Sequence, residues 1–387
     1  MYNIKTYNKI SAAGLCEFDA EKYTIGDDVA EPVGAIVRSA SLHEAEFPKS
    51  LLAIARAGAG TNNIPCDRCA SEGIVVFNTP GANANAVKEL VVAGLLLSSR
   101  RVIPAIEWAK TLKGNGDSVP KMVESGKGAF AGGEIRGKKI GIIGLGAIGV
   151  MVANAANALG MKVYGYDPFL SIKSAWNLTH NAVYVSDLKE IYKNCDYITL
   201  HVPLTPDTKG FINAETLALM KDNVRIMNFA RAELVNSADM IIALEQNKVA
   251  TYVTDFPTDE MIGINGVIAI PHLGASTAES ENNCAAMAVK ELIEYIENGN
   301  IENSVNFPSI SMPRSTDKRI CVMHKNIPNM LTAITSAVAE NNINIENLLN
   351  KSKGDFAYSI LDIGEADYDA IQKKLDGIDG VIRVRII

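Results

Sequence analysis

The feature that most restricts how this chain can fold is a glycine-rich turn between a strand pattern and a helix pattern. Residues 139–143 form an apolar run, and Gly144, Gly146 and Gly149 follow it in the spacing Gly-x-Gly-x-x-Gly. The first glycine allows a tight turn, the second lets the backbone approach a ligand, and the third lets the helix pack closely on the strand. N–H groups at a helix start also attract negative charge. The pattern predicts a parallel βαβ unit that binds a dinucleotide pyrophosphate through Gly144, Gly146, Ala147, Ile148 and Gly149.

A carboxylate after the next strand indicates which dinucleotide binds. Residues 162–166 read as a second strand, and Asp167 follows it, eighteen residues past Gly149. This carboxylate is placed to accept hydrogen bonds from both ribose hydroxyls, and it would repel the additional phosphate of NADP. Residues 168–170 contain no arginine that could bind that phosphate. We therefore predict NAD, ahead of a flavin, because flavoproteins usually carry this motif at their N-terminus.

The charge and the apolar pattern argue against several classes of partner. The formal net charge is −7 and no lysine- or arginine-rich run occurs, so we expect neither nucleic acid nor an anionic membrane. The first residues lack the apolar core of a signal peptide, and the apolar stretch at residues 91–97 is too short to cross a bilayer. Cys66 and Cys69 form a lone Cys-x-x-Cys, which favours ordinary reduced thiols and no metal. We expect a cytoplasmic protein.

Three domains are predicted, of which the first is discontinuous. Residues 1–95 alternate strand and helix patterns, and a long helix within residues 277–305 is expected to return to them as one substrate-binding domain. Residues 96–276 form a succession of strand–helix units, which we assign as the NAD-binding domain. Residues 306–317 contain prolines and serines and are predicted to be a linker. Residues 318–387 follow the order βαββαβ of a ferredoxin-like domain.

The predicted fold class is α/β. We expect a Rossmann-type doubly wound nucleotide domain, a flavodoxin-like substrate domain and a C-terminal ferredoxin-like domain. Ligands of open α/β sheets gather beyond the carboxyl ends of the strands. Arg38 and Arg56 end two strands of the first domain, and Arg231 and His272 follow two strands of the second. All four are therefore candidates for contact with a substrate.

Five further motifs occur in a fixed order along the chain. They are Arg56-Ala57-Gly58, Asn78-Thr79-Pro80-Gly81-Ala82-Asn83, His201-Val202-Pro203-Leu204, Asn228-Phe229-Ala230-Arg231 and Pro271-His272-Leu273-Gly274-Ala275-Ser276-Thr277. With the glycine-rich turn they resemble the D-isomer-specific 2-hydroxyacid dehydrogenase family over nearly the whole length. Within it the resemblance points to members that oxidise D-3-phosphoglycerate to 3-phosphohydroxypyruvate, the first step of L-serine biosynthesis. Those members carry a C-terminal ACT domain, which has the ferredoxin-like order.

The resemblance implies a base, an anchor and an orienting acid. The base is His272, which takes the hydroxyl proton, and the anchor is Arg231, which can hold the substrate carboxylate through two hydrogen bonds. The acid is Glu260 or Asp259. The family pattern Asp-Val-Phe-x-x-Glu-Pro favours Glu260 when it is counted from Asp255, which would then line the nicotinamide pocket. Alignment on the following Phe-Pro pair gives Asp259 instead.

The resemblance also implies contacts around the catalytic residues. Arg38 and Arg56 would contact the substrate phosphate, because a phosphate needs cations beyond the carboxylate anchor. Backbone amides near Ala57-Gly58 would help to hold the carboxylate, and Asn83 would contact the substrate or the cofactor rim. The remaining cofactor contacts implied are His201, Val202, Pro203, Ala230, Asp255 and Gly274.

The C-terminal domain has no catalytic set, and the resemblance implies regulation. His324, Asn326 and Asn344 stand where serine-regulated relatives bind L-serine at a domain interface. Asn329 replaces the usual glycine before the helix and adds bulk there. The simpler alternative is an oligomerisation module, because exposed sheet edges favour pairing between subunits. The family resemblance also implies a homo-oligomer, a dimer or a tetramer.

Two other functions stay open. One is a different D-2-hydroxyacid dehydrogenase, acting on D-lactate, glycerate or hydroxypyruvate, which would need fewer cations. The other is a non-catalytic NAD sensor, against which the presence of Arg231, an acid and His272 argues. One departure from the family pattern is Lys88-Glu89, where a small residue more often precedes the acid. Lys88 either adds positive potential or is solvated.

Overall fold

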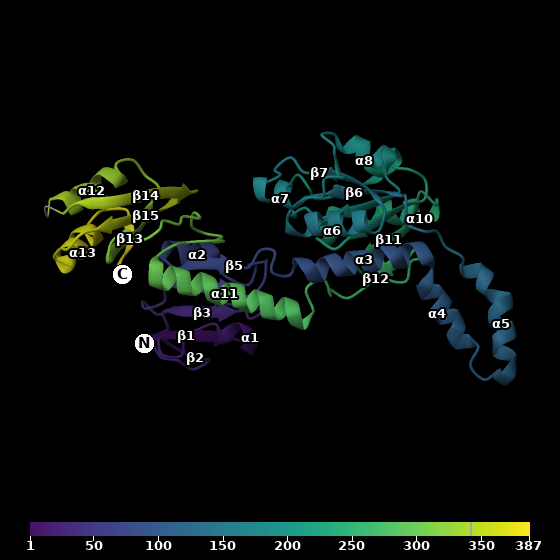
Figure 1. The fold of residues 1–387 in the computed structure, drawn as a ribbon, viewed down its shortest axis with the longest axis horizontal. Helices are drawn as coiled ribbons and strands as arrows, with labels where there is room; N and C mark the ends of the chain where they lie inside the picture. Colours follow the sequence, from purple (N-terminus) through teal and green to yellow (C-terminus); the bar gives the residue numbers. More distant parts are fainter. Residues whose placement is uncertain (341–342) are drawn as a thin grey trace. The chain divides into compact units, whose positions relative to one another are not determined.

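The computed structural model describes residues 1–340 and 343–387, whose contacts divide them into two compact units (Figure 1). Unit 1 comprises Met1–Asn83 and Ala278–Ile387, and unit 2 comprises Ala84–Thr277. Among the described helices, none combines the length and the apolar character that crossing a membrane requires.

Unit 2 is built on a seven-stranded parallel sheet with the order β12-β11-β10-β9-β6-β7-β8. Its strands are β6 (Lys139–Ile143), β7 (Lys162–Tyr166), β8 (Val183–Tyr184), β9 (Tyr197–Leu200), β10 (Val224–Asn228), β11 (Val249–Thr254) and β12 (Val267–Ala269). β6 pairs with β7 on one side and β9 on the other, so the strand order reverses there. Open α/β sheets bind ligands at such a switch point. The order confirms the predicted Rossmann-type sheet.

Two hydrophobic clusters hold helices on this sheet. The first includes residues of α3 (Ala84–Arg100) and α6 (Ala147–Ala158), and the second includes residues of α8 (Leu188–Asn194), α9 (Ala214–Leu219) and α10 (Ser237–Glu245). Between α3 and β6 lie α4 (Val102–Thr111), η1 (Gly116–Ser118), α5 (Val119–Gly126) and η2 (Lys127–Phe130). We call residues 102–130 the arm. Neither α4 nor α5 buries a residue, and the arm extends away from the sheet of unit 2 (Figure 1).

The N-terminal part of unit 1 is a five-stranded parallel sheet with the order β2-β1-β3-β4-β5. Its strands are β1 (Tyr2–Tyr7), β2 (Tyr23–Gly26), β3 (Gly34–Val37), β4 (Ala53–Arg56) and β5 (Val75–Asn78). This order is flavodoxin-like, as predicted. The accompanying helices are α1 (Ala12–Leu15), α2 (Cys66–Ser71) and α11 (Ala278–Asn298). α11 packs on β3, β4 and β5 although it is far from them in sequence (Figure 1).

The C-terminal part of unit 1 is a four-stranded antiparallel sheet with the order β14-β15-β13-β16. Its elements are β13 (Lys318–Lys325), α12 (Met330–Ala339), β14 (Ile345–Lys353), β15 (Phe356–Ile363), α13 (Tyr368–Asp376) and β16 (Val381–Ile386). The order βαββαβ confirms the predicted ferredoxin-like fold. Residues of α12 and α13 share one hydrophobic cluster with this sheet. Other residues of the same strands, Cys321, Met323, Tyr358 and Ile360, belong to the core that contains α11.

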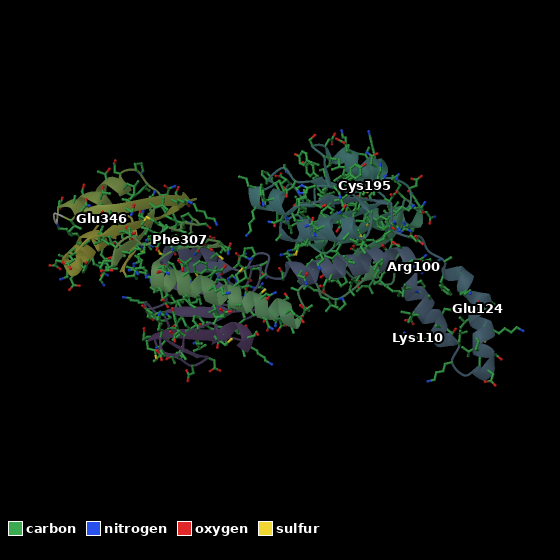
Figure 2. The ribbon with its side chains drawn as sticks, viewed as in Figure 1. Arg100, Lys110, Glu124, Cys195, Phe307 and Glu346 are labelled. Carbon is green, nitrogen blue, oxygen red and sulfur yellow. The ribbon has the colours of Figure 1, made fainter. Side chains whose placement is uncertain are left out.

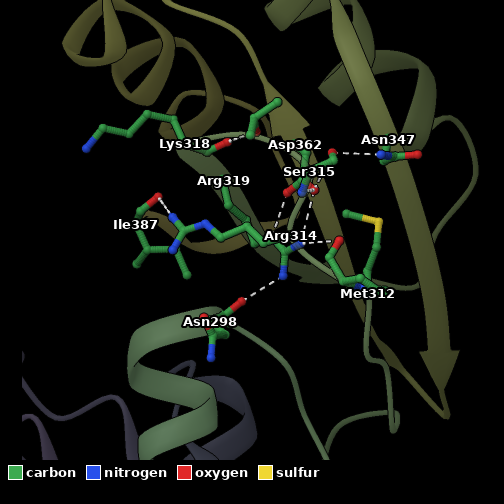
Figure 3. Close-up of polar contacts among 12 residues, drawn as sticks. Asn298, Met312, Arg314, Ser315, Lys318, Arg319, Asn347, Asp362 and Ile387 are labelled. Carbon is green, nitrogen blue, oxygen red and sulfur yellow. Dashed lines mark hydrogen bonds and ion pairs between the residues drawn. The ribbon is translucent and has the colours of Figure 1, made fainter.

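Arginines of the C-terminal part bind the carbonyl end of α11, and Figure 3 shows the contact of Arg319 with Asn298. Arg385 donates to the carbonyls of Tyr295 (3.2 Å) and Ile296 (2.8 Å). Arg319 donates to the carbonyl of Asn298 (2.9 Å) and forms an ion pair with Asp362 (2.6 Å), in which both side chains are fully buried. The last carbonyls of a helix lack partners within it. Residues distant in sequence therefore satisfy them here.

The contact units differ from the predicted domain limits at α3. This helix is continuous from Ala84 to Arg100, whereas the predicted boundary at residue 95 divides it. Its buried residues pack against β10, β11 and α6, so residues 84–95 belong with unit 2. Apolar spacing gave no signal of which sheet this helix covers. The three-domain division, with its linker at residues 306–317, stays a prediction.

Candidate active site

The glycine-rich turn has the geometry that a dinucleotide requires. Gly144 adopts φ 94°, a left-handed conformation that favours glycine. A side chain on Gly149 would overlap the carbonyl of Gly144, so glycine is needed for α6 to pack on the turn. No atom lies within 4 Å of the position that a Cβ on Gly146 would take, which leaves that face open to a ligand. Ala147 and Ile148 begin α6, where N–H groups lack partners within the helix.

Asp167 stands directly after β7 and faces this turn. Its Oδ2 accepts a hydrogen bond from the N–H of Leu145 (2.8 Å), and its Oδ1 accepts one from the N–H of Phe169 (2.8 Å). The carboxylate is therefore held beside the glycine-rich turn, at the carboxyl end of the strand next to β6. A carboxylate at this place fits the ribose of NAD and would repel a ribose phosphate.

His201 follows β9, where it borders the same switch point. Its Nε2 lies 3.0 Å from Oγ1 of Thr199. Burial lowers the pKa of His201 to about 4. The ring is therefore neutral near pH 7, and it is a poor candidate to hold a proton taken from a substrate. Val202 and Pro203 continue the loop after β9.

Phe256 brings together the two residues predicted to be the anchor and the base. The guanidinium carbon of Arg231 lies 5.8 Å from the centroid of the Phe256 ring, and the His272 ring centroid lies 4.5 Å from it. Arg231 and His272 are both exposed, so a ligand could reach them. Arg231 is steadied by Asn228, whose Nδ2 donates to the Arg231 carbonyl (2.8 Å), and its own Nη1 donates to the carbonyl of Ala230 (2.6 Å). Sequence reasoning missed Phe256, although it stands directly after β11 and Asp255.

Asp255 is the carboxylate that interacts electrostatically with both of these residues. It is 1% exposed, and its Oδ2 accepts a hydrogen bond from the N–H of Gly274 (2.9 Å). Burial raises the pKa of Asp255, while the Gly274 hydrogen bond and the charges of His272 and Arg231 oppose that rise. Its Oδ1 is buried and has no hydrogen-bond partner among the described residues. Asp255 thus lies under the exposed cluster and contributes negative charge to it.

The structure does not choose between the two acids predicted to pair with His272. Asp259 and Glu260 are both exposed, and in the described part of the chain neither forms a hydrogen bond or an ion pair with that histidine. The segment that carries them, between β11 and β12, contains turns and no helix or strand. The role of Glu260 or Asp259 as orienting acid therefore stays a prediction.

The residues predicted to contact the substrate phosphate lie in unit 1, at the carboxyl end of its parallel sheet. Arg56 ends β4, and its Nε donates to the carbonyl of Arg38 (3.1 Å). Arg38 follows β3 and forms an ion pair with Glu281 of α11 (2.7 Å). The N–H groups of Ala57 and Gly58 donate to the carbonyls of Val37 and Arg56, so both are engaged within the chain (2.8 Å each). Asn83 is the last residue before α3.

The residues predicted to bind L-serine have partners within the C-terminal sheet. His324 is 2% exposed. Its Nδ1 donates to the carbonyl of Lys325 (2.8 Å), and its Nε2 lies 3.1 Å from Oγ of Ser359 and 3.2 Å from Oδ1 of Asn350. Asn326 donates to the carbonyl of Gly354 (3.0 Å), and Asn344 donates to Glu346 (2.7 Å). In this chain by itself, the histidine ring is enclosed rather than presented to a ligand.

The Cys66–Cys69 pair has the properties of ordinary thiols. Both cysteines are free. Burial raises the pKa of Cys66, and it raises the pKa of Cys69 to about 12. Both therefore stay protonated near neutral pH and are weak nucleophiles.

Comparison with known proteins identifies the family. Residues 93–274 match the family described as "D-isomer specific 2-hydroxyacid dehydrogenase, NAD binding domain". A D-3-phosphoglycerate dehydrogenase of Haemophilus influenzae is 33% identical over 98% of this chain and 93% of its own length. One of Escherichia coli is 35% identical over 88% of this chain and 82% of its own length. The chain belongs to the D-isomer specific 2-hydroxyacid dehydrogenase family.

A solved structure of similar fold supports the cofactor of this 2-hydroxyacid dehydrogenase. NAD+-bound 3-phosphoglycerate dehydrogenase of Entamoeba histolytica superposes with a TM-score of 0.59 at 26% identity, covering 80% of this chain and 99% of its own. D-2-hydroxyisocaproate dehydrogenase, at 20% identity and a TM-score of 0.64, shows the shared fold alone. The predicted family and the predicted cofactor are confirmed. The chain is an NAD-dependent oxidoreductase that acts on a small molecule.

Proposed function

We propose that this 2-hydroxyacid dehydrogenase oxidises D-3-phosphoglycerate to 3-phosphohydroxypyruvate. The observation that carries the proposal is the placement of Arg231 and His272 on one aromatic ring, Phe256, at the carboxyl edge of the dinucleotide-binding sheet. Relatives that match nearly the whole chain bear the name of this activity, which supports the choice of substrate.

The chain's own residues suit the two steps that they must assist, which are removal of the hydroxyl proton and polarisation of the forming carbonyl. His272 takes the C2 hydroxyl proton, because partial burial lowers the pKa of the other histidine near the site, His201. Arg231 holds the carboxylate and polarises the forming carbonyl with its planar guanidinium. Asp255 interacts electrostatically with both side chains, whose charges oppose the rise that burial causes in its pKa. Bound NAD supplies the hydride acceptor.

The substrate phosphate would be held by the arginines of unit 1. Arg56 and Arg38 are joined by a hydrogen bond and stand at the carboxyl ends of neighbouring strands. A doubly charged phosphate binds best to several fixed cations. To bind the phosphate, Arg38 would have to give up its ion pair with Glu281. Binding of the substrate carboxylate by Arg231 requires no such exchange.

The Arg38–Glu281 pair also favours the second candidate, a dehydrogenase of smaller hydroxy acids. If Glu281 keeps Arg38, the first domain offers fewer cations for a phosphate, and D-lactate, glycerate or hydroxypyruvate become the better substrates. Oxidation of NADH at 340 nm with phosphohydroxypyruvate, hydroxypyruvate, pyruvate and glyoxylate separates the two candidates. We expect phosphohydroxypyruvate to have the highest kcat/KM, and Arg56→Ala to lower that value far more than the value for hydroxypyruvate.

The base assignment has its own test. His272→Gln removes the proton acceptor while it keeps a polar side chain of similar length. We expect kcat to fall about 10²- to 10⁴-fold, while the affinity for NADH, measured by its fluorescence, stays the same. Near-normal turnover in this variant would exclude His272 as the base. NADH binding without turnover in the wild type would instead indicate a sensor.

L-Serine regulation and self-association are proposals of the same kind. Binding of L-serine by His324, Asn326 and Asn344 would require the enclosed histidine to leave Ser359. Isothermal titration with L-serine tests this, and absence of heat at millimolar serine excludes it.

A homo-oligomer is supported by the arm, where Val102, Ile103 and Ile106 are exposed by 38, 38 and 50%. The two helices of the arm also carry charged residues, of which Lys110 on α4 and Glu124 on α5 are labelled in Figure 2. A cytoplasmic location stays a prediction.

A further inference from the structure

Lys88 lies on the face of α3 that the fold buries. The apolar stripe of this helix includes Ala84, Val91 and Leu95, each fully buried. Residues three and four apart share a helix face, and Lys88 lies four after Ala84 and three before Val91. Its side chain is only 22% exposed. The lysine therefore interrupts the stripe rather than standing on the solvated side of the helix.

This stripe leads to the catalytic residues of unit 2. A Cβ atom added to Gly94 would lie 3.2 Å from the ring of Phe229 and 3.3 Å from the side chain of Val253. About two turns earlier, roughly 10 Å along the helix, Val87 lies 3.4 Å from the Cβ position of Gly274. The first turns of α3 thus pass beyond the carboxyl ends of β10 and β11.

The same contacts fix which catalytic groups lie nearby. Phe229 and Val253 stand two residues before Arg231 and Asp255. Gly274, which Val87 contacts, donates its N–H to Asp255 and lies two residues after His272. Lys88 is the neighbour of Val87 in the chain, so the turn of helix that carries it borders this cluster.

The intramolecular partners of Lys88 do not account for a lysine on the inner face of this helix. The carboxylate paired with it is Glu89, at 3.5 Å, and that side chain is 64% exposed and also accepts a hydrogen bond from Asn85 (2.9 Å). Within the described residues, the Lys88 ammonium donates no hydrogen bond. An exposed ion pair adds little stability, so the contact with Glu89 does not by itself explain a lysine within the apolar stripe. An ammonium carries three donors, so this one retains donors for a ligand.

We propose that Lys88 is a second cationic anchor for the substrate, which binds a substrate oxyanion alongside Arg231. The inference rests on the proposed function, because it assigns a further residue to the same reaction. The oxyanion is the carboxylate, which all 2-hydroxy acids share, or the phosphate. A lysine suits this role as a compact point charge that needs no fixed approach direction.

The test compares Lys88→Met with Lys88→Arg and with Glu89→Gln, which removes only the ion-pair partner. KM and kcat are measured with phosphohydroxypyruvate and with hydroxypyruvate, NADH affinity by fluorescence, and Tm by thermal unfolding. For Lys88→Met we expect KM to rise about tenfold or more, NADH affinity to stay unchanged, and Tm to stay the same or rise. We expect Lys88→Arg to recover much of the affinity, and Glu89→Gln to keep the wild-type KM.

The two substrates identify the oxyanion. A rise of KM for both keto acids assigns Lys88 to the carboxylate, and a rise for the phosphorylated one alone assigns it to the phosphate. Unchanged KM for both overturns the proposal, as does a rise in the Kd of NADH of the same size as the rise in KM. If the wild type reduces hydroxypyruvate and not phosphohydroxypyruvate, the proposed substrate fails while the Lys88 comparison proceeds on hydroxypyruvate.

Discussion

Glu291 is a carboxyl group held inside the core of unit 1, on α11. It is 6% exposed, and its Oε1 accepts a hydrogen bond from Asn303 (2.8 Å), while its Oε2 has no partner among the described residues. Burial raises the pKa of Glu291 to about 8, and the nearby charge of Glu302 adds to the rise. This side chain is therefore mostly protonated near pH 7.

The raised pKa of Glu291 makes the stability of unit 1 depend on pH. Above the ordinary value of 4.5 the unfolded chain releases this proton, but the folded chain keeps it until about pH 8. The contribution to the free energy of unfolding is therefore complete below pH 4.5 and is lost as the pH rises to about 8. Between pH 6 and 8.5 we expect a loss of about 2 kcal/mol, measured by urea unfolding.

Glu291→Gln is the matched variant, because it keeps the shape and removes the titration. Its unfolding free energy should vary less with pH than that of the wild type by about the same 2 kcal/mol. Parallel pH curves for the two proteins would show that the buried carboxyl group does not titrate as we expect.

At the residue scale, sequence reasoning identified the candidate anchor and base but not their surroundings. Arg231 and His272 follow strands, and strand ends are where ligands of these sheets bind. Phe256 was missed, because an aromatic residue after a strand usually indicates packing. The identity of the orienting acid stayed open because three acids, Asp255, Asp259 and Glu260, lie within one stretch of six residues. The turns of this stretch do not follow from a periodic sequence pattern.

At the scale of elements, α12 begins with an unusual backbone conformation. Its N-cap residue, Asn329, adopts φ 68° and ψ 0°, and its side chain makes no capping hydrogen bond. The left-handed region costs most residues about 1–2 kcal/mol, and glycine and, to a lesser degree, asparagine are exempt. The sequence showed asparagine in place of the family's glycine, and the structure explains why asparagine is accepted there.

The stability of variants at position 329 should therefore follow how well each residue tolerates the left-handed conformation. We expect Asn329→Gly to keep or raise the Tm, and Asn329→Ala to lower the free energy of unfolding by about 1 kcal/mol. Differential scanning calorimetry measures both changes. An alanine variant as stable as the glycine variant would mean that the chain can leave the left-handed region at no cost.

The elements themselves were predictable where a pattern repeats. β7 and the strand–turn–helix of β6 and α6 follow from apolar runs and glycine spacing. The division at α3 did not follow, because the buried stripe of a helix shows that it packs but not against which sheet. The enclosure of His324 was also missed, since a strand pattern does not reveal that Ser359 lies opposite the ring.

At the scale of the molecule, a buried ion pair within the C-terminal sheet is linked to the rest of unit 1 through its arginine. Arg319 and Asp362 are fully buried, and the arginine also binds the carbonyl of Asn298 at the end of α11 (Figure 3). Asp362 further accepts hydrogen bonds from the N–H and the hydroxyl of Ser315 (2.9 Å each). The pair therefore belongs to a network that spans the predicted linker.

Removing one member of this pair should be far worse than removing both. Asp362→Leu or Arg319→Met leaves a buried charge without its partner, which costs about 3–5 kcal/mol. The double variant Arg319→Met with Asp362→Leu should recover a large part of that loss. Urea unfolding of the four proteins gives the coupling energy. If the double variant loses as much unfolding free energy as the two single variants together, the two residues do not stabilise each other.

The arginines that bind the end of α11 bear on whether the chain would stay folded without its C-terminal sheet. If translation stopped after residue 305, the terminal carbonyls that Arg385 and Arg319 now bind would be left to water. The hydrophobic core that contains α11 would also lose Cys321, Met323, Tyr358 and Ile360 of the C-terminal strands. In this chain the C-terminal sheet is a structural part of unit 1, because its strands share a hydrophobic core with α11.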